Sequence, residues 1–166
     1  LDSFLVQPKN VLLSVITTDV ETSALGDLIY AYIMLFVYGI TIKNFLLFTL
    51  FIICGGLMLV SIAVILGSLS FWFNKSDIIS DTGNSLMVNF ASYPDGIFKG
   101  VAKILLFTLI PVGIANYLPV HVISEFNLSY FLIILLVTLF LIGMAIIVFN
   151  SGLKKYSSSN LMIARI

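Results

Sequence analysis

The stretch from Asn44 to Asn74 contains no Asp, Glu, Lys, Arg or His. Its interior, from Phe45 to Phe73, consists almost entirely of Leu, Ile, Val, Phe, Met, Gly and Ala. As a single helix this interior would be about 44 Å long, whereas the hydrocarbon core of a bilayer is about 30 Å thick. The sequence therefore predicts a helix that crosses a membrane. Its Phe71-Trp72-Phe73 end is expected at the interface, where bulky aromatic side chains are enriched.

The composition extends this prediction to the whole chain. With 60% hydrophobic residues, 10% charged residues and a mean hydropathy of +1.16, the chain has too little polar surface for a water-soluble domain. Eight basic side chains balance eight acidic ones, so no excess charge indicates a nucleic-acid partner. The one cysteine, Cys54, cannot form an intrachain disulfide and is expected to pack as a small hydrophobe. The sequence begins at Leu1 without a basic-then-apolar leader, which we interpret as a truncated start.

Three further apolar runs are long enough to be spans. The first covers Leu25 to Ile42, and the polar pair Lys43-Asn44 after it is expected to form a tight turn. The second covers Ile104 to Leu118, counted back to Val101, and Pro111 inside it predicts a kinked helix. The last covers Phe126 to Phe149.

Two segments have the pattern of amphipathic helices. In the first, from Gln7 to Glu21, Pro8 suits the first helical position, and apolar residues recur four apart, but the segment is too polar to cross a bilayer. The second runs from Ser76 to about Ser92 and should break before Pro94, which can begin the next helix. Both are expected at the membrane surface or against a partner protein.

The distribution of basic residues predicts the orientation. With four spans, the N-terminal segment, the central polar loop and the C-terminal tail lie on one side. That side carries seven of the eight basic residues: Lys9, Lys75, Lys99, Lys103, Lys154, Lys155 and Arg165. Because short cytoplasmic loops are enriched in Lys and Arg, this side is expected to be cytoplasmic, with both the N-terminal segment and the tail inside the cell.

The predicted fold is an all-α polytopic membrane bundle with four transmembrane helices and amphipathic interfacial helices. Its segments are a cytoplasmic helix and loop at 1–24, a transmembrane hairpin at 25–73, a cytoplasmic amphipathic loop at 74–100, a kinked transmembrane pair at 101–149 and a cytoplasmic tail at 150–166.

Residues that carry chemistry are sparse. The sequence has no Gly-Lys-Ser/Thr phosphate loop and no Cys/His metal cluster. His121 and Glu125 lie four apart, which is weak support for an acid-base or metal pair beside a span boundary. Asp27, at the start of a span, is interpreted as capping or hydrating the helix start rather than as an ion relay. We therefore expect no catalytic residue, no bound metal and no cofactor on this chain, and an energy source elsewhere.

A stripe of polarisable side chains lies along the first span. Tyr30, Met34 and Tyr38 are four apart and share a helix face. They are interpreted as packing or as an aromatic belt, with the wall of a cavity for an amphipathic substrate as the alternative. Together with Asn116 they are the candidates for a substrate pathway.

Several fragments, in order along nearly the whole chain, resemble the permease subunits of ABC-2 type ATP-binding-cassette exporters of the bacterial branch. They are Gln7-Pro8-Lys9-Asn10-Val11-Leu12, Thr18-Asp19-Val20-Glu21, Leu25-Gly26-Asp27, Ser70-Phe71-Trp72-Phe73, Tyr93-Pro94 with Ile97-Phe98, Ile110-Pro111-Val112, Tyr117-Leu118-Pro119 and Gly152-Leu153-Lys154-Lys155-Tyr156-Ser157-Ser158.

The resemblance implies a six-span fold in the cell membrane, of which this chain matches the last four spans. It places a coupling helix, which meets the ATPase subunit, on Pro8, Leu12, Ile16, Asp19 and Glu21. It also places the kinked span near the outer face, with Pro111 and Pro119 as kink or gating residues. ATP and Mg would be bound by the partner ATPase, and a second permease subunit, identical or different, would complete the transporter within membrane lipid.

Three hypotheses follow. The first is a permease subunit of an exporter, driven by a separate ATPase. The second is a passive channel or an ion-coupled secondary transporter, whose activity would need no ATPase and would depend on Asp27. The third, a membrane-embedded enzyme, would require His121 or Glu125 and is favoured by nothing in the sequence.

Overall fold

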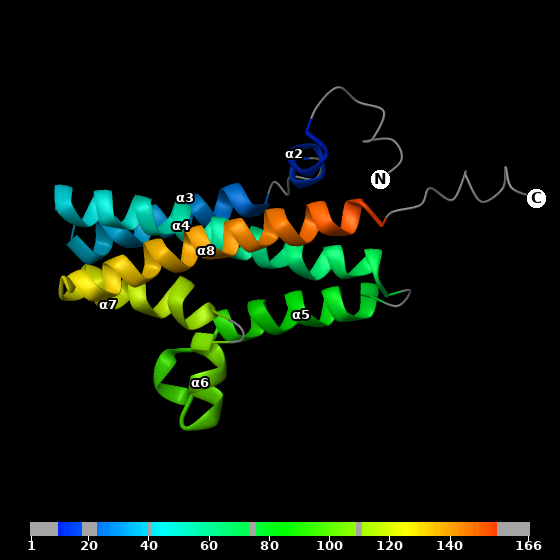
Figure 1. Cartoon of the computed structure of the whole chain (residues 1–166). Coiled ribbons are helices and arrows are strands. Elements are labelled where there is room, and N and C mark those ends of the chain that lie inside the picture. Colours follow the sequence, from blue (N-terminus) through cyan, green and yellow to red (C-terminus); the bar gives the residue numbers. More distant parts are fainter. Residues whose placement is uncertain (1–9, 18–22, 40, 74–75, 109–110, 156–166) are drawn as a thin grey trace, which may run out of the picture. The chain divides into compact units, whose positions relative to one another are not determined.

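The computed structural model describes residues 10–17, 23–39, 41–73, 76–108 and 111–155, and the regular elements within these ranges are all helical. The chain divides into two compact units, Leu1–Phe45 with Ser157–Ile166, and Leu46–Tyr156. Figure 1 shows the helices along the chain. The boundary between the units falls inside one continuous helix, α4 (Ile42–Ser68), and each unit is described by itself.

The first unit begins with a short helix, α2 (Val11–Ile16). Asn10 is its N-cap, and the side-chain oxygen of Asn10 accepts a hydrogen bond of 3.0 Å from the backbone N–H of Leu12. α2 therefore begins at Val11, whereas Pro8, predicted to occupy the first helical position, lies outside the described residues. The rest of the predicted helix, at 1–9 and 18–22, lies outside the described residues.

The second helix of this unit, α3 (Ser23–Gly39), corresponds to the first predicted span and is only 17 residues long. It ends at Gly39, whose φ of 112° is readily adopted only by glycine. The predicted turn at Lys43-Asn44 is therefore wrong, since both residues lie in the first turn of α4. The rings of Tyr32 and Phe45 lie 5.8 Å apart across the turn.

Two helices in the described residues are long and apolar enough to cross a membrane. They are α4 with its 3-10 extension η1 (Leu69–Phe71), 30 residues in all, and α8 (Leu128–Leu153), 26 residues. Only 28% and 17% of their apolar stretches are buried. Such exposed apolar helices are suited to lipid, because in water a core helix of this composition would be covered.

Buried hydroxyls in these two helices bond to their own backbone. Ser61 donates to the carbonyl of Leu57 and Ser68 to that of Val64, both at 2.6 Å. Thr138 in α8 donates in the same way at 2.7 Å. Hydroxyls that bond one turn back along their own helix need no water, which fits a segment inside a bilayer.

A further helix, α5 (Ser76–Ala91), confirms the predicted amphipathic helix to within one residue at its end. Within the second unit it runs back along the end of α4 (Figure 1). Ser80 donates a hydrogen bond of 2.9 Å to the carbonyl of Leu66, and a Cβ on Gly83 would lie 2.6 Å from Leu66 Cδ1. One face of α5 is thus packed against α4 instead of lying on its own at an interface.

The next part of the chain differs from the sequence prediction. Pro94 precedes only a single 3-10 turn, η2 (Asp95–Ile97), and Gly100, at a φ of 58°, leads into α6 (Val101–Thr108). The described part of the predicted kinked span consists of α6 and, after Pro111, a π-helical turn, η3 (Gly113–Tyr117), which continues directly into α7 (Leu118–Ser124); residues 109 and 110 lie outside the described residues, so a single kinked helix remains a prediction. Pro119 therefore lies inside a helix rather than after one.

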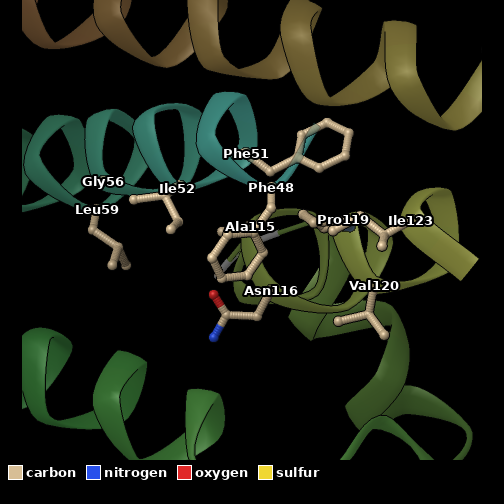
Figure 2. Close-up of a pocket in the computed structure, with 11 residues that line it drawn as sticks. Phe48, Phe51, Ile52, Gly56, Leu59, Ala115, Asn116, Pro119, Val120 and Ile123 are labelled. Carbon is tan, nitrogen blue, oxygen red and sulfur yellow. The ribbon is translucent and has the colours of Figure 1, made fainter. Parts of the chain in front are cut away.

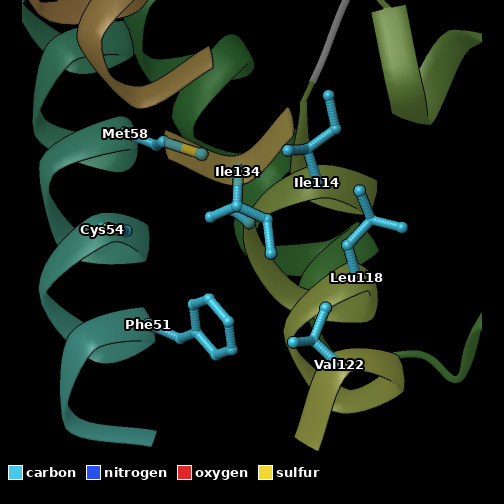
Figure 3. Close-up of a cluster of buried hydrophobic side chains, with 8 residues drawn as sticks. Phe51, Cys54, Met58, Ile114, Leu118, Val122 and Ile134 are labelled. Carbon is cyan, nitrogen blue, oxygen red and sulfur yellow. The ribbon is translucent and has the colours of Figure 1, made fainter. Parts of the chain in front are cut away.

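The last helix, α8, begins at Leu128, because the side-chain oxygen of Asn127 accepts hydrogen bonds from the N–H groups of Ser129 and Tyr130. The core of the second unit lies where α4, η3, α7 and α8 meet (Figure 3). Its buried residues are Phe51, Cys54, Met58, Ile114, Ala115, Leu118, Val122 and Ile134.

Candidate functional site

The predicted ATPase-coupling residues are described only in part. Leu12 is half-buried and Ile16 exposed, both in α2, whereas Pro8, Asp19 and Glu21 lie outside the described residues. α2 buries none of its residues, so its apolar side chains are available to another surface. The coupling role remains a prediction.

The predicted substrate-pathway residues belong to different units. Tyr30, Met34 and Tyr38 form an exposed stripe on α3, with 61%, 49% and 67% of their surface accessible. This does not support internal packing within their own unit, since packed side chains would be covered. Asn116 belongs to the second unit, and its association with the stripe remains a prediction.

The two prolines singled out in the sequence flank the π-helical turn. Pro111 is buried, and its carbonyl accepts hydrogen bonds from Ile114 and Ala115 at 3.1 and 2.9 Å. At the other end of the turn, the N–H of Leu118 donates to the carbonyl of Gly113, five residues earlier. Pro119 follows in the first turn of α7 and has no N–H to donate to the carbonyl of Ala115. The carbonyl of Ala115 therefore lacks the donor that residue 119 would supply in a regular α-helix.

That acceptor lies against the middle of α4. A Cβ built on Gly55 would lie 3.5 Å from the carbonyl oxygen of Ala115, so the two backbones approach closely at this glycine. Beside this contact is a groove with a volume of about 340 Å³ (Figure 2). It is lined by Phe48, Phe51, Ile52, Gly55, Gly56, Leu59, Ala115, Asn116, Pro119, Val120 and Ile123.

The groove is apolar apart from one side chain. Asn116 supplies an amide, and none of the eleven lining residues is charged. A concave, mainly apolar site with few polar groups is the usual form of a small-molecule site. Of the predicted pathway residues, Asn116 is the one that lines this groove. Its partners Gly55 and Gly56 were missed, although paired glycines in an apolar helix indicate that another backbone comes close.

The turn is also joined to α5. The hydroxyl of Tyr117 donates toward the carbonyl oxygens of Phe90 and Tyr93, each 2.8 Å away. Phe90 lies in the last turn of α5 and Tyr93 lies two residues beyond the helix; the Phe90 carbonyl also accepts a longer hydrogen bond, of 3.4 Å, from the N–H of Tyr93. Tyr117 therefore connects the amphipathic helix to the turn that forms one wall of the groove.

We expect Tyr117→Phe to loosen this connection. The ring would fit unchanged, but the carbonyls of Phe90 and Tyr93 would lose the hydroxyl that donates to them, at a cost of about 1–2 kcal/mol. Heat unfolding in detergent and hydrogen exchange of residues 76–93 measure the effect, which should be faster exchange in this segment. Tyr93→Phe is the matched control, because the Tyr93 side chain is 55% exposed. Equal exchange in the two variants would contradict the assignment.

At the C-terminal end of α4, the aromatic fragment Phe71-Trp72-Phe73 lies against the C-terminal end of α8. The ring of Phe71 packs edge-on against that of Phe149 with centroids 5.9 Å apart, and it covers Gly152. The ammonium of Lys155 lies 5.9 Å from the centre of the Trp72 ring, a cation-π distance. The aromatic span end and the Gly-Leu-Lys-Lys segment are therefore one structural joint between α4 and α8.

Charged chemistry is scarce in this unit. His121 is exposed in the last turn of α7, and Glu125 is the exposed residue at which that helix ends. In the described part of the chain no group of three or more His, Cys, Asp or Glu side chains could hold a metal ion.

Comparison with known proteins identifies one similarity. Residues 1–160 match the family described as ABC-2 family transporter protein. No curated protein and no solved structure matches the chain.

Proposed function

The chain belongs to the ABC-2 transporter family, whose members are membrane components of ABC transporters, and on this premise we propose that it is the permease subunit of an exporter. The family match over residues 1–160 is the observation that carries the proposal. ATP and Mg would be bound by a separate ATPase subunit, and a second permease subunit would complete the pathway.

The exposed apolar surfaces of α4 and α8 support a position in the bilayer. In the proposed arrangement α3 is a third span, and α6 with η3 and α7 supplies a fourth, broken crossing. Irregular backbone at membrane depth is tolerated where it is buried in protein or lines a cavity, and η3 meets this condition beside the groove. The bias of basic residues supports a cytoplasmic position for the N-terminal segment and the tail.

The mechanism is an alternation between two states. ATP-driven association of the ATPase subunits would push on the segment around α2 and rock the two permease halves between inward-open and outward-open forms. α5 is packed against α4 and bonded through Tyr117 to the π-helical turn. A movement of α5 would therefore reach the groove directly.

The test is ATP hydrolysis by the reconstituted complex. The permease in lipid nanodiscs, mixed with its ATPase subunit, should bind that subunit and change its rate of ATP hydrolysis. A reconstituted permease that moves substrate with no ATPase present would instead support a passive channel or a secondary transporter.

The coupling helix makes a sharper prediction within this assay. Asp19→Lys together with Glu21→Lys should weaken ATPase binding by roughly tenfold, equivalent to about 1.4 kcal/mol, by reversing the charge of the contact surface. Glu125→Lys is the control for a single reversal of an acidic side chain, because Glu125 lies at the exposed end of α7, outside the predicted coupling helix. Unchanged assembly of the Asp19 and Glu21 variant would contradict the coupling role.

A further inference from the structure

The groove between α4 and the η3–α7 segment lies at the middle of a long apolar helix. Gly56, one of its lining residues, is halfway along the 30-residue segment Ile42–Phe71. A ligand in this groove would therefore lie near the centre of the hydrocarbon core. The volume of about 340 Å³ is at the lower end of the range of small-molecule sites, about 300–1,000 Å³.

One polar side chain at the groove has no hydrogen-bond partner among the described residues. Asn116 lines the groove, and its side chain makes no hydrogen bond within the described part of the chain. In hydrocarbon an unsatisfied polar group costs several kcal/mol. The amide offers two N–H donors and an acceptor oxygen, which a hydroxyl or a primary amide of a ligand can satisfy.

The charge of the ligand follows from the lining. Since all eleven lining residues are uncharged, a permanently charged head group would be desolvated with no counter-charge beside it. Phe48, Ile52 and Leu59 offer apolar surface to the rest of the molecule (Figure 2).

We propose that this groove binds a neutral amphiphile whose head group donates and accepts hydrogen bonds, such as a long-chain alcohol or primary amide. The groove would be an intermediate substrate-binding site on the export pathway. The inference rests on the proposed function, and it adds to it the chemical class of the cargo. Asn116 holds the head group, and the walls of α4 and α7 hold the chain.

The test uses the full chain in phosphatidylcholine nanodiscs and a long-chain alcohol that carries a photoreactive diazirine on its alkyl chain. Labelling should fall within residues 48–59 and 115–123 and be competed by unlabelled alcohol. The matched methyl ether, which cannot donate a hydrogen bond, should label roughly fivefold less, the equivalent of one hydrogen bond of about 1 kcal/mol. The matched trimethylammonium probe should label less still. Equal labelling by the three probes would overturn the proposal.

Two variants in α4 separate filling of the groove from a general change in the helix. A Cβ on Gly56 or on Gly67 meets nothing within 4 Å, so leucine fits at either position, but only Gly56 lines the groove. Gly56→Leu should abolish the competed labelling, and Gly67→Leu should keep it. Asn116→Leu should bring alcohol labelling down to the level of the ether. If Gly56→Leu changes the oligomeric state and leaves the labelling intact, the groove is a protein contact and the proposal is wrong.

A final experiment distinguishes a transported substrate from a structural lipid. In the complex with the ATPase subunit, ATP should release the bound alcohol and lower the labelling. Labelling that persists unchanged with ATP would overturn the cargo assignment and leave a lipid site. An ATPase subunit that fails to bind, with the labelling pattern intact, would instead contradict the proposed function and not the site.

Discussion

Gly152→Leu should destabilise the fold by about 3 kcal/mol, the upper end of the cost of overpacking. A Cβ at position 152 would overlap the Phe71 ring and lie 2.8 Å from its Cγ. The ring cannot easily move away, because it packs edge-on against Trp72 and Phe149. Leucine favours the helix more than glycine does, by up to about 1 kcal/mol, which is less than the clash.

Heat unfolding in detergent and the retention of a single peak on size exclusion measure this effect. Gly143→Leu is the matched control: it makes the same substitution in the same helix, where a Cβ meets nothing within 4 Å. The control should be as stable as the parent or slightly more so. If both variants unfold at the same temperature, Phe71 does not occupy the space beside Gly152.

Met58→Ala is expected to remove about 2 kcal/mol of stability. Met58 is fully buried in the cluster that joins α4 to α7 and α8 (Figure 3), so alanine would leave a cavity there. The estimate is at the low end for such a change, because in a bilayer the unfolded helices remain in an apolar solvent and only the packing contacts are lost.

Its control is the neighbouring residue. Leu57 is 43% exposed, so Leu57→Ala removes a similar side chain from a surface that lipid covers in both states. Unfolding in increasing SDS should show a lower midpoint for Met58→Ala alone. Equal midpoints would mean that the cluster does not hold the helices together.

The long helices could be predicted because lipid imposes a simple requirement, a run of apolar residues of sufficient length. The sequence located α4, α5 and α8 to within a few residues. The sequence was less accurate for helix ends whose positions depend on a capping hydrogen bond or on the backbone conformation of one residue. The end of α3 depends on the positive φ of Gly39, and the starts of α2 and α8 on the capping side chains of Asn10 and Asn127. For α3 and α8 the apolar run set the predicted ends, and the shorter-range signals of Gly39 and Asn127 were not used.

The segment around Pro111 shows a different limit. A proline in an apolar run predicts a kink but not a π-helical turn, because such a turn depends on what packs beside the backbone. The same applies to the candidate site. Asn116 could be singled out as a polar residue in an apolar run, whereas the groove needs Gly55 and Gly56 from a distant part of the chain.

The aromatic joint formed by Phe71, Phe149 and Gly152 limits how the molecule can move. If α4 moved along α8 by even one residue, the Phe71 ring would either clash with the backbone of α8 or lose its contacts with Phe149 and Gly152. These two long helices must therefore tilt and translate as a single rigid body. We therefore expect any rearrangement within this unit to involve the π-helical turn Gly113–Tyr117, whose backbone departs from the regular α-helix, while the joined pair of helices stays fixed.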